Sequence, residues 1–290
     1  MPLSHRLRFS IPLPDGRALE LGARTLVMAV VNVTPDSFSD GGVRFDAARA
    51  IADAQRMVED GADILDIGGE STRPGAAPLP EDEELRRVLP VIDGLHRTVH
   101  VPISVDTYKA GVADRAVDAG ATIVNDISAL TYDPALAGVV ARRGTAVILM
   151  HNRGRSTAMY EHATYVDVVG EVAAELSERA DAALAAGIMR DRIVLDPGLG
   201  FAKRASQTLT ALAGLRRFAE LGYPVLSGPS RKSFLKEGVG DVPPAERIWG
   251  TAAAVAASVM LGAHIVRVHD VREMLQVVRV ADEVASRVAD

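Results

Sequence analysis

The sequence contains no cysteine, which excludes both disulfide bonds and thiolate metal sites. No apolar run approaches the roughly 18 residues that a transmembrane helix requires. Aromatic residues are scarce, at 4% of the chain, and the net charge is -6. This argues against a nucleic-acid partner, because such partners are bound by clustered basic and stacking side chains. We expect a soluble, cytoplasmic protein that binds neither nucleic acid nor membrane.

The chain instead contains a regular alternation of short apolar runs and amphipathic segments. The apolar runs predict strands at 26–33, 64–69, 102–107, 123–128, 146–151, 193–198, 224–228 and 264–269. The amphipathic segments predict helices at 46–60, 81–98, 110–119, 134–142, 165–186, 205–221, 245–261 and 271–288. Without a low-complexity linker, these units predict one domain over 1–290, an α/β fold of the (β/α)8 TIM barrel type. A polar and apolar alternation at about 6–24 predicts a β-hairpin that acts as a lid or plug.

A doubly wound open sheet is the alternative fold for this pattern. The units are similar in length, and a glycine stands shortly before six of the strands, where a helix-to-strand turn is expected. No GxGxxG fingerprint follows the first strand, which disfavours a dinucleotide-binding sheet. We therefore favour the barrel.

Polar residues stand at the carboxyl end of nearly every expected strand. In a barrel these ends form one mouth, where active sites lie. Any single residue of this kind could be a structural cap, but the joint pattern predicts a site. The residues are Asn32, Asp66, Asp106, Asn125, Asp126, His151, Asp196, Arg267 and His269.

Asp106, Asn125 and Asp196 would enter one cavity from the third, fourth and sixth strands. A buried carboxylate is costly unless a ligand or a neighbour donates hydrogen bonds to it. The edge of an aminopyrimidinone ring donates two parallel hydrogen bonds to one carboxylate, and Lys232 would pair with the ring carbonyl. The alternative is an internal ion pair between lysine and aspartate without a ligand.

A second group of side chains suits a phosphate or pyrophosphate. Arg73, Arg267 and His269, together with Asn32, would surround it at the barrel mouth. Because the net charge is negative, this local cluster is not a by-product of composition. Asn32 would also offer an oxygen ligand to a Mg2+ ion that keeps most of its waters and bridges phosphate oxygens.

The stretch 30–42, VVNVTPDSFSDGG, changes abruptly from an apolar strand into a loop. Pro35 ends the strand, and the loop then carries carboxylates, hydroxyls and one aromatic ring, that of Phe38. A plain connector needs no such ring. We expect Asn32 to belong to the fixed part of the site, and Phe38 and Asp40 to a lid that closes after the first substrate has bound.

In chain order, the motifs NVTPDSFSDGG, DIGGESTRPGA, SVDT, NDIS, LMHNR, DPGLGF, SGPSRKSF and RVHDV resemble those of the dihydropteroate synthases. The resemblance covers nearly all of the chain except the hairpin. It implies a barrel that requires Mg2+ and forms a homodimer through its last helices. It also implies condensation of 6-hydroxymethyl-7,8-dihydropterin pyrophosphate with p-aminobenzoate, giving 7,8-dihydropteroate and pyrophosphate.

The resemblance also implies roles for individual residues. The pterin pocket falls on Asp106, Asn125, Met150, Asp196, Phe201, Lys232 and Arg267. The pyrophosphate site falls on Asn32, Arg73, Arg267 and His269, with Asn32 as metal ligand. The p-aminobenzoate site falls on Phe38, Thr72 and Ser233. The residues expected to carry the chemistry are Asp40, Asp106 and Lys232.

The sequence departs from the family pattern after the sixth strand. Ala202 stands where glycine is common, and Thr208 stands where asparagine is frequent. We expect both residues at the rim of the barrel, where they affect the geometry of this loop and not the class of reaction.

Other interpretations remain open at this point. The same fold serves pterin-dependent methyltransferases, and a non-catalytic pterin-binding paralogue would also keep the pocket. The segment 245–261 is apolar nearly all round and rich in alanine, which indicates a dimer contact unless the hairpin or a neighbouring helix covers it.

Overall fold

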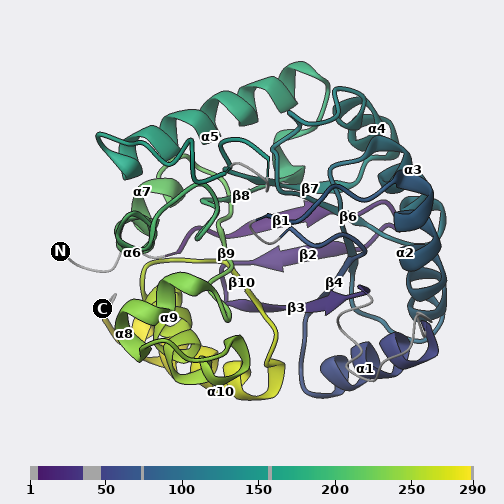
Figure 1. The fold of residues 1–290 in the computed structure, drawn as a ribbon. Helices are drawn as coiled ribbons and strands as arrows, with labels where there is room; N and C mark the ends of the chain where they lie inside the picture. The colour runs from purple at the N-terminus through teal and green to yellow at the C-terminus, as the bar shows by residue number, and fades with distance from the viewer. Residues whose placement is uncertain (1–5, 35–46, 73–74, 156–158, 289–290) are drawn as a thin grey trace.

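The computed structural model describes residues 6–34, 47–72, 75–155 and 159–288, and its centre is a barrel of eight parallel strands (Figure 1). The strands are β3 (Leu26–Asn32), β4 (Ile64–Gly68), β5 (Ile103–Asp106), β6 (Ile123–Asp126), β7 (Ala146–Met150), β8 (Ile193–Asp196), β9 (Leu226–Ser227) and β10 (Ile265–Val268). Their order is β8-β7-β6-β5-β4-β3-β10-β9, and a parallel bridge from Leu195 to Val225 joins the two outer strands. The TIM barrel is therefore confirmed, and the open doubly wound sheet is wrong.

Helices surround the barrel, as the alternating pattern predicts (Figure 1). They are α1 (Ala47–Glu59), α2 (Glu81–His96), α3 (Ala110–Asp118), α4 (Leu136–Arg143), α5 (Val168–Ala185), α6 (Ala205–Ala213), α7 (Leu215–Ala219), α8 (Lys236–Val239), α9 (Ile248–Met260) and α10 (Val271–Val288). Within the described ranges, no helix combines the length and the apolar character needed to cross a membrane.

Two predicted elements differ from the structure. The helix expected at 205–221 is divided into α6 and α7 at Gly214, which packs so closely on α5 that a β-carbon there would lie 2.6 Å from Val169. The strand expected at 224–228 is reduced to Leu226–Ser227, because Gly228 and Pro229 follow and proline has no N–H to donate to a neighbouring strand.

The predicted hairpin closes the amino-terminal end of the barrel. Its strands, β1 (Phe9–Pro12) and β2 (Ala18–Leu21), pair antiparallel. Apolar side chains of the hairpin share one buried cluster with the first residues of the barrel strands: Ile11, Leu13, Leu19, Leu21, Leu26, Met28, Ile64, Ile123, Ala146, Ile148, Val194, Leu226 and Ile265. Each leucine, isoleucine, valine or methionine of this cluster contributes roughly 1.5 to 3 kcal/mol when fully buried. The hairpin is thus a plug, and the opposite end of the barrel is left for the site.

The strand register brings predicted site residues together at that opposite end. Asp106 on β5 lies beside Asn125 on β6, and Met150 on β7 lies beside Asp196 on β8. Since all eight strands are parallel, their carboxyl ends meet around one mouth.

Candidate active site

Arg267 on β10 is held between two carboxylates, those of Asp66 on β4 and Asp106 on β5. Its Nε donates to Asp66 Oδ2 at 2.6 Å, and its Nη2 donates to Asp106 Oδ2 at 2.7 Å. Asn125 Nδ2 donates to the same oxygen of Asp66 at 2.9 Å. Two charged hydrogen bonds on different nitrogens fix the plane of the guanidinium within the barrel mouth.

Asp66 has no role among the predicted site residues, although it links Arg267 to Asn125. It is completely buried, and its Oδ1 has no hydrogen-bond partner within the described part of the chain. The signal in the sequence is a single carboxylate inside the apolar run ILDIG of a buried strand. We interpret Asp66 as the residue that orients Arg267, because a buried carboxylate is costly without a paired cation.

Asp196, Phe201 and Lys232 form the adjoining part of the site. Asp196 ends β8, and its Oδ1 accepts a hydrogen bond of 2.7 Å from the N–H of Gly198. Lys232 Nζ donates to the carbonyl of Leu199 and lies 4.5 Å from the centre of the Phe201 ring. Among the described residues, no ion pair joins Lys232 to an aspartate, which disfavours the alternative of an internal salt bridge.

Asn125 and Met150 complete the residues predicted for the pterin pocket. Both are buried at the ends of their strands, Asn125 beside Asp106 and Met150 beside Asp196. The structure therefore gathers the whole predicted pterin set at one end of the barrel.

Burial makes the charges of this cluster costly. It raises the pKa of Asp106 to about 7, although Arg267 opposes the shift. It also raises the pKa of Asp196, against the attraction of Lys232. It lowers the pKa of Lys232 to about 8, and here Asp196 opposes the shift. A ligand that donates hydrogen bonds to the carboxylates and accepts one from the lysine would relieve these costs.

His269 and Asn32, both predicted to bind pyrophosphate, stand at the ends of the adjacent strands β10 and β3. The N–H of His269 donates to Ser230 Oγ at 3.2 Å, and Nδ1 lies 3.0 Å from the same hydroxyl. Burial, reinforced by the positive charge of Arg267, lowers the pKa of His269 to about 3. The neutral ring accepts the hydroxyl hydrogen at Nδ1 and thus keeps Nε2–H as a donor for an anionic oxygen.

The residues predicted for p-aminobenzoate are described only in part. Phe38, Asp40 and Arg73, the last predicted for pyrophosphate, lie outside the described residues. Thr72 is half-buried in the loop after β4, and Ser233 is exposed at the start of a 3-10 turn over Ser233–Leu235. The second substrate's site therefore stays a prediction.

A second buried network, which has no predicted role, lies beneath the loop that follows β8. Lys203 is only 1% exposed and its Nζ donates to His151 Nδ1 at 2.9 Å. It also donates to the carbonyls of Gly198 and Phe201, each at 3.1 Å. His151 Nε2 in turn lies 3.0 Å from Glu175 Oε2 on α5. The sequence shows a lysine soon after DPGLGF, but its burial depends on how the loop folds.

Ala202 lies in the loop that follows β8 and Thr208 in α6, and both side chains are fully buried. Ala202 has φ +47, the left-handed conformation that favours glycine and costs another residue roughly 1 to 2 kcal/mol. Its carbonyl accepts a hydrogen bond of 3.0 Å from the hydroxyl of Tyr165. Thr208 Oγ1 donates to the carbonyl of Arg204 at 3.0 Å within α6.

The arrangement suits a flat, nitrogen-rich ring that carries an anionic group. Carboxylates accept the N–H groups of such a ring, a lysine donates to its carbonyl, and the flat face of Arg267 can stack on it. His269 and Asn32 offer polar groups beside Arg267 for the anionic part.

Comparison with known proteins shows the family of this chain. The family model for pterin binding enzymes matches residues 28–269. The dihydropteroate synthase of Synechocystis sp. is 46% identical over 275 residues, which cover 94% of this chain and 95% of that protein. The structure of Xanthomonas albilineans dihydropteroate synthase with 4-aminobenzoic acid matches with a TM-score of 0.88 at 45% identity, over 94% of this chain and 98% of that one. Its complex with 7,8-dihydropteroate matches with a TM-score of 0.86 at 42% identity, over 95% and 98% of the two chains. This chain therefore belongs to the pterin-binding enzyme family, among its dihydropteroate synthases.

Proposed function

We propose that this enzyme condenses 6-hydroxymethyl-7,8-dihydropterin pyrophosphate with p-aminobenzoate, releasing 7,8-dihydropteroate and pyrophosphate. The observation that carries the proposal is the cluster of buried charges in which Asp106, Asp196, Lys232 and Arg267 interact electrostatically at the barrel mouth. The identity to dihydropteroate synthases over nearly the whole chain supports the same reaction.

Pterin recognition follows from the donors and acceptors of this cluster. Asp196 accepts the two parallel N–H groups of the aminopyrimidinone edge. Lys232, whose ammonium is bonded to the Leu199 carbonyl in the free enzyme, turns to the ring carbonyl. Arg267 stacks on the ring, with its plane already set by Asp66 and Asp106. This orientation before binding reduces the entropy lost when the ring is seated.

The reaction proceeds by departure of the pyrophosphate before the arylamine attacks. The C–O bond breaks with both electrons going to pyrophosphate, and a methylene cation remains on the pterin. The ionised carboxylate of Asp106 stabilises this cation, and by resemblance Asp40 shares the role. The neutral arylamine nitrogen attacks the cation and then loses a proton to solvent. His269, already neutral, donates from Nε2 to the leaving group and needs to accept no proton.

Mg2+ is part of the proposal, with Asn32 as its ligand from the protein. Among the described residues there is no group of three or more His, Asp or Glu side chains that could enclose a metal ion. A single exposed amide oxygen at the end of β3 fits an ion that keeps most of its waters and takes phosphate oxygens. When bound there, Mg2+ would neutralise charge that develops on the pyrophosphate.

One assay separates this function from its alternatives. The enzyme is incubated with the pterin pyrophosphate and Mg2+, with or without p-aminobenzoate, and pyrophosphate is measured. Release that depends on p-aminobenzoate supports the synthase. Pterin binding without release would support the non-catalytic paralogue. Methyl transfer from a methylated pterin, without such release, would support the methyltransferase.

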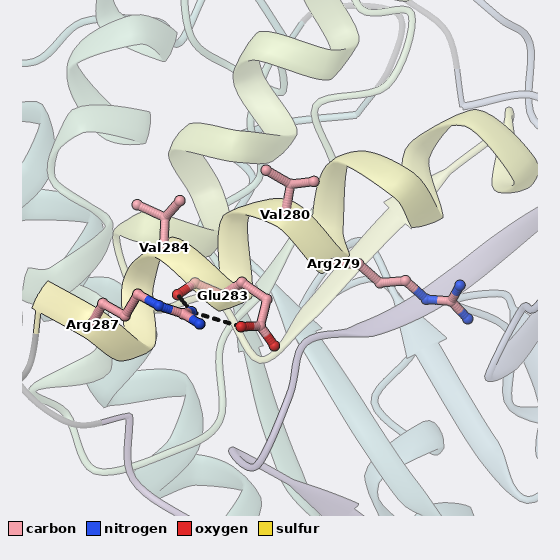
Figure 2. Close-up of a pocket in the computed structure, with 5 residues that line it drawn as sticks. All are labelled: Arg279, Val280, Glu283, Val284 and Arg287. Carbon is pink, nitrogen blue, oxygen red and sulfur yellow. Dashed lines mark hydrogen bonds and ion pairs between the residues drawn. The ribbon is translucent and has the colours of Figure 1, made fainter.

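A homodimer through α9 and α10 is also part of the proposal. These two helices pack against each other, and they expose Trp249, at 80%, and Val280, at 66%. Figure 2 shows Val280 and Val284 on the same side of α10, next to the ion pair of Glu283 and Arg287. They line a shallow hollow of about 390 Å³. Large exposed apolar side chains of this kind mark association surfaces, and a second copy of α10 would cover them.

A cytoplasmic location stays a prediction from the sequence.

A further inference from the structure

Lys203 is buried beneath the residues 198–202, here called the β8 loop. Its ammonium has three acceptors, namely His151 Nδ1 and the carbonyls of Gly198 and Phe201. Three acceptors match the three hydrogens of an ammonium. Burial lowers the pKa of Lys203 to about 7, against the attraction of Asp196, so the ammonium is present at and below neutral pH. A charge buried at 1% exposure is costly, and all three of its hydrogens are bonded to the loop and to the neighbouring strand end.

The bond to Glu175 determines which ring nitrogen of His151 carries the hydrogen. Hydrogen bonds from His151 and Arg153 lower the pKa of Glu175 to about 2 against the effect of burial, so its carboxylate can only accept. The ring hydrogen therefore lies on Nε2, which donates to Glu175 Oε2 at 3.0 Å, and Nδ1 is left to accept from Lys203. Burial lowers the pKa of His151 to about 4, although Glu175 opposes the shift, so the ring is neutral near pH 7. Arg153 pairs with the same glutamate. A line of hydrogen bonds thus runs from α5 through His151 to the β8 loop.

The two carbonyls that accept from Lys203 belong to Gly198 and Phe201, and the backbone from one to the other also contacts two residues of the proposed pterin pocket. Gly198 donates its N–H to Asp196, and Leu199 accepts from Lys232 with its carbonyl. Both pocket residues are therefore bonded to the backbone that Lys203 holds. A shift of the β8 loop would therefore move the carboxylate of Asp196 and the ammonium of Lys232 together.

The β8 loop needs such an anchor because its backbone is unusual. Gly198, Gly200 and Ala202 have φ of +66, +78 and +47. No strand or helix includes these residues, so no ladder of backbone hydrogen bonds maintains their conformation. A turn-type bond of 3.0 Å from the N–H of Phe201 to the carbonyl of Gly198 joins the two residues whose carbonyls Lys203 binds. Ala202 adds the cost of a methyl group in the left-handed region.

We propose that Lys203 is a positioning residue for pterin binding, which holds the β8 loop in the shape that presents Asp196 and Lys232 to the ring. This inference deepens the proposed function and rests on it. Lys203 is too deeply buried to contact a substrate, so it acts through the loop. Its removal should weaken pterin binding and leave the p-aminobenzoate site, on other loops, unchanged.

Replacing Lys203 by a neutral side chain of similar length tests this role. Lys203→Met should raise the KM for the pterin pyrophosphate about tenfold or more, and it should leave the KM for p-aminobenzoate within about twofold. Lys109→Met is the matched control, because Lys109 is a largely buried lysine bonded to Glu70 and Glu84. It should leave the pterin KM within about twofold of the wild type.

A second pair of variants tests the hydrogen-bonded chain Glu175–His151–Lys203 at its α5 end. The side chain of Glu175 is 35% exposed, so a replacement there is tolerated. Glu175→Gln keeps an oxygen that accepts from His151 Nε2, whereas Glu175→Leu does not. Both replacements remove the negative charge that pairs with Arg153, so the loss of this ion pair is common to the two variants. Glu175→Leu should raise the pterin KM about threefold or more, and Glu175→Gln should stay close to the wild type.

The outcomes distinguish this inference from the function on which it rests. Release of pyrophosphate by the wild type tests the function alone. If the wild type turns over and both Lys203→Met and Glu175→Leu keep its pterin KM, the positioning role is wrong. Equal rises in the KM of both substrates would also contradict it, because they indicate a general loss of structure. If Lys203→Met does not fold, the two Glu175 variants decide by the same criterion.

Discussion

Arg267 on β10 donates a hydrogen bond of 2.7 Å to Asp106 on β5, a residue 161 positions away in the chain. In the barrel, β3 and β4 lie between these two strands, so the bond crosses the mouth between strand ends that are not adjacent. Asp66 accepts the second bond of the same guanidinium from the intervening β4. The cation proposed to stack on the pterin and the carboxylate proposed to stabilise the product of C–O cleavage are therefore hydrogen-bonded to each other in the free enzyme.

Asp106→Asn should gain stability relative to the wild type as the pH rises from 5 to 8, while it impairs the reaction. Burial raises the pKa of Asp106 to about 7, well above its unfolded value, against the effect of Arg267. The stability that this group contributes is fully present at low pH and is lost as the pH rises through 7. The variant carries no such loss. Its Tm relative to the wild type should therefore rise by about 3 °C or more between pH 5 and pH 8, the effect of roughly 1 kcal/mol.

Thermal unfolding followed by circular dichroism at both pH values measures this difference. Asp114→Asn is the control, because a hydrogen bond from Arg143 lowers the pKa of that exposed carboxylate. It should show no gain at pH 8. A difference in Tm between Asp106→Asn and the wild type that is the same at both pH values would show that Asp106 does not titrate in this range.

Asp196→Asn should abolish pterin binding. The amide replaces one acceptor by a donor, which would face the N–H groups of the ring, and a loss of roughly 100-fold in affinity is expected from two charged hydrogen bonds. Calorimetry with the pterin pyrophosphate measures it. Asp133→Asn is the control, since Asp133 also accepts backbone N–H groups, at Ala110 and Ala135, but lies outside the cluster of buried charges. Unchanged affinity in Asp196→Asn would mean that the pocket assignment is wrong.

Removing Mg2+ should stop turnover without unfolding the enzyme. EDTA should abolish pyrophosphate release and excess MgCl2 should restore it, whereas the Tm should not change because the described residues form no acidic cage for a metal ion. Asn32→Ala should raise the Mg2+ concentration for half-maximal rate about tenfold, the loss of one ligand. An unchanged Mg2+ requirement in Asn32→Ala would exclude this residue as the ligand.

Val280→Asp should convert the proposed dimer into a monomer. It places a charge in the middle of the exposed apolar surface of α10, where burial in an interface would require its desolvation. Sedimentation velocity measures the state of association. Val166→Asp is the control, because Val166 is a fully exposed valine outside α9 and α10, and this variant should remain dimeric. If the wild type itself sediments as a monomer, the proposed interface is wrong.

Sequence patterns were sufficient for the architecture because they repeat. Eight buried strands need eight apolar runs, and the end of each run marks the barrel mouth, so Asp106, Asn125 and Asp196 could be assigned to one cavity before the fold was known. Helix boundaries depend on tertiary contacts as well: Gly214 divides a helix only because α5, a segment distant in the chain, packs against it.

By itself, the sequence determined the barrel, the plugging hairpin and the family of the chain, since these follow from periodicity and from motifs that are local in the chain. Only the tertiary structure decided which polar groups pair. It selected Asp66 as a partner of Arg267, placed Ala202 and Thr208 inside the protein, and surrounded Lys203 with His151 and two carbonyls. Hydrogen bonds of this kind form only when atoms of residues far apart in the chain are positioned to within a few tenths of an ångström, and no local pattern encodes such positions.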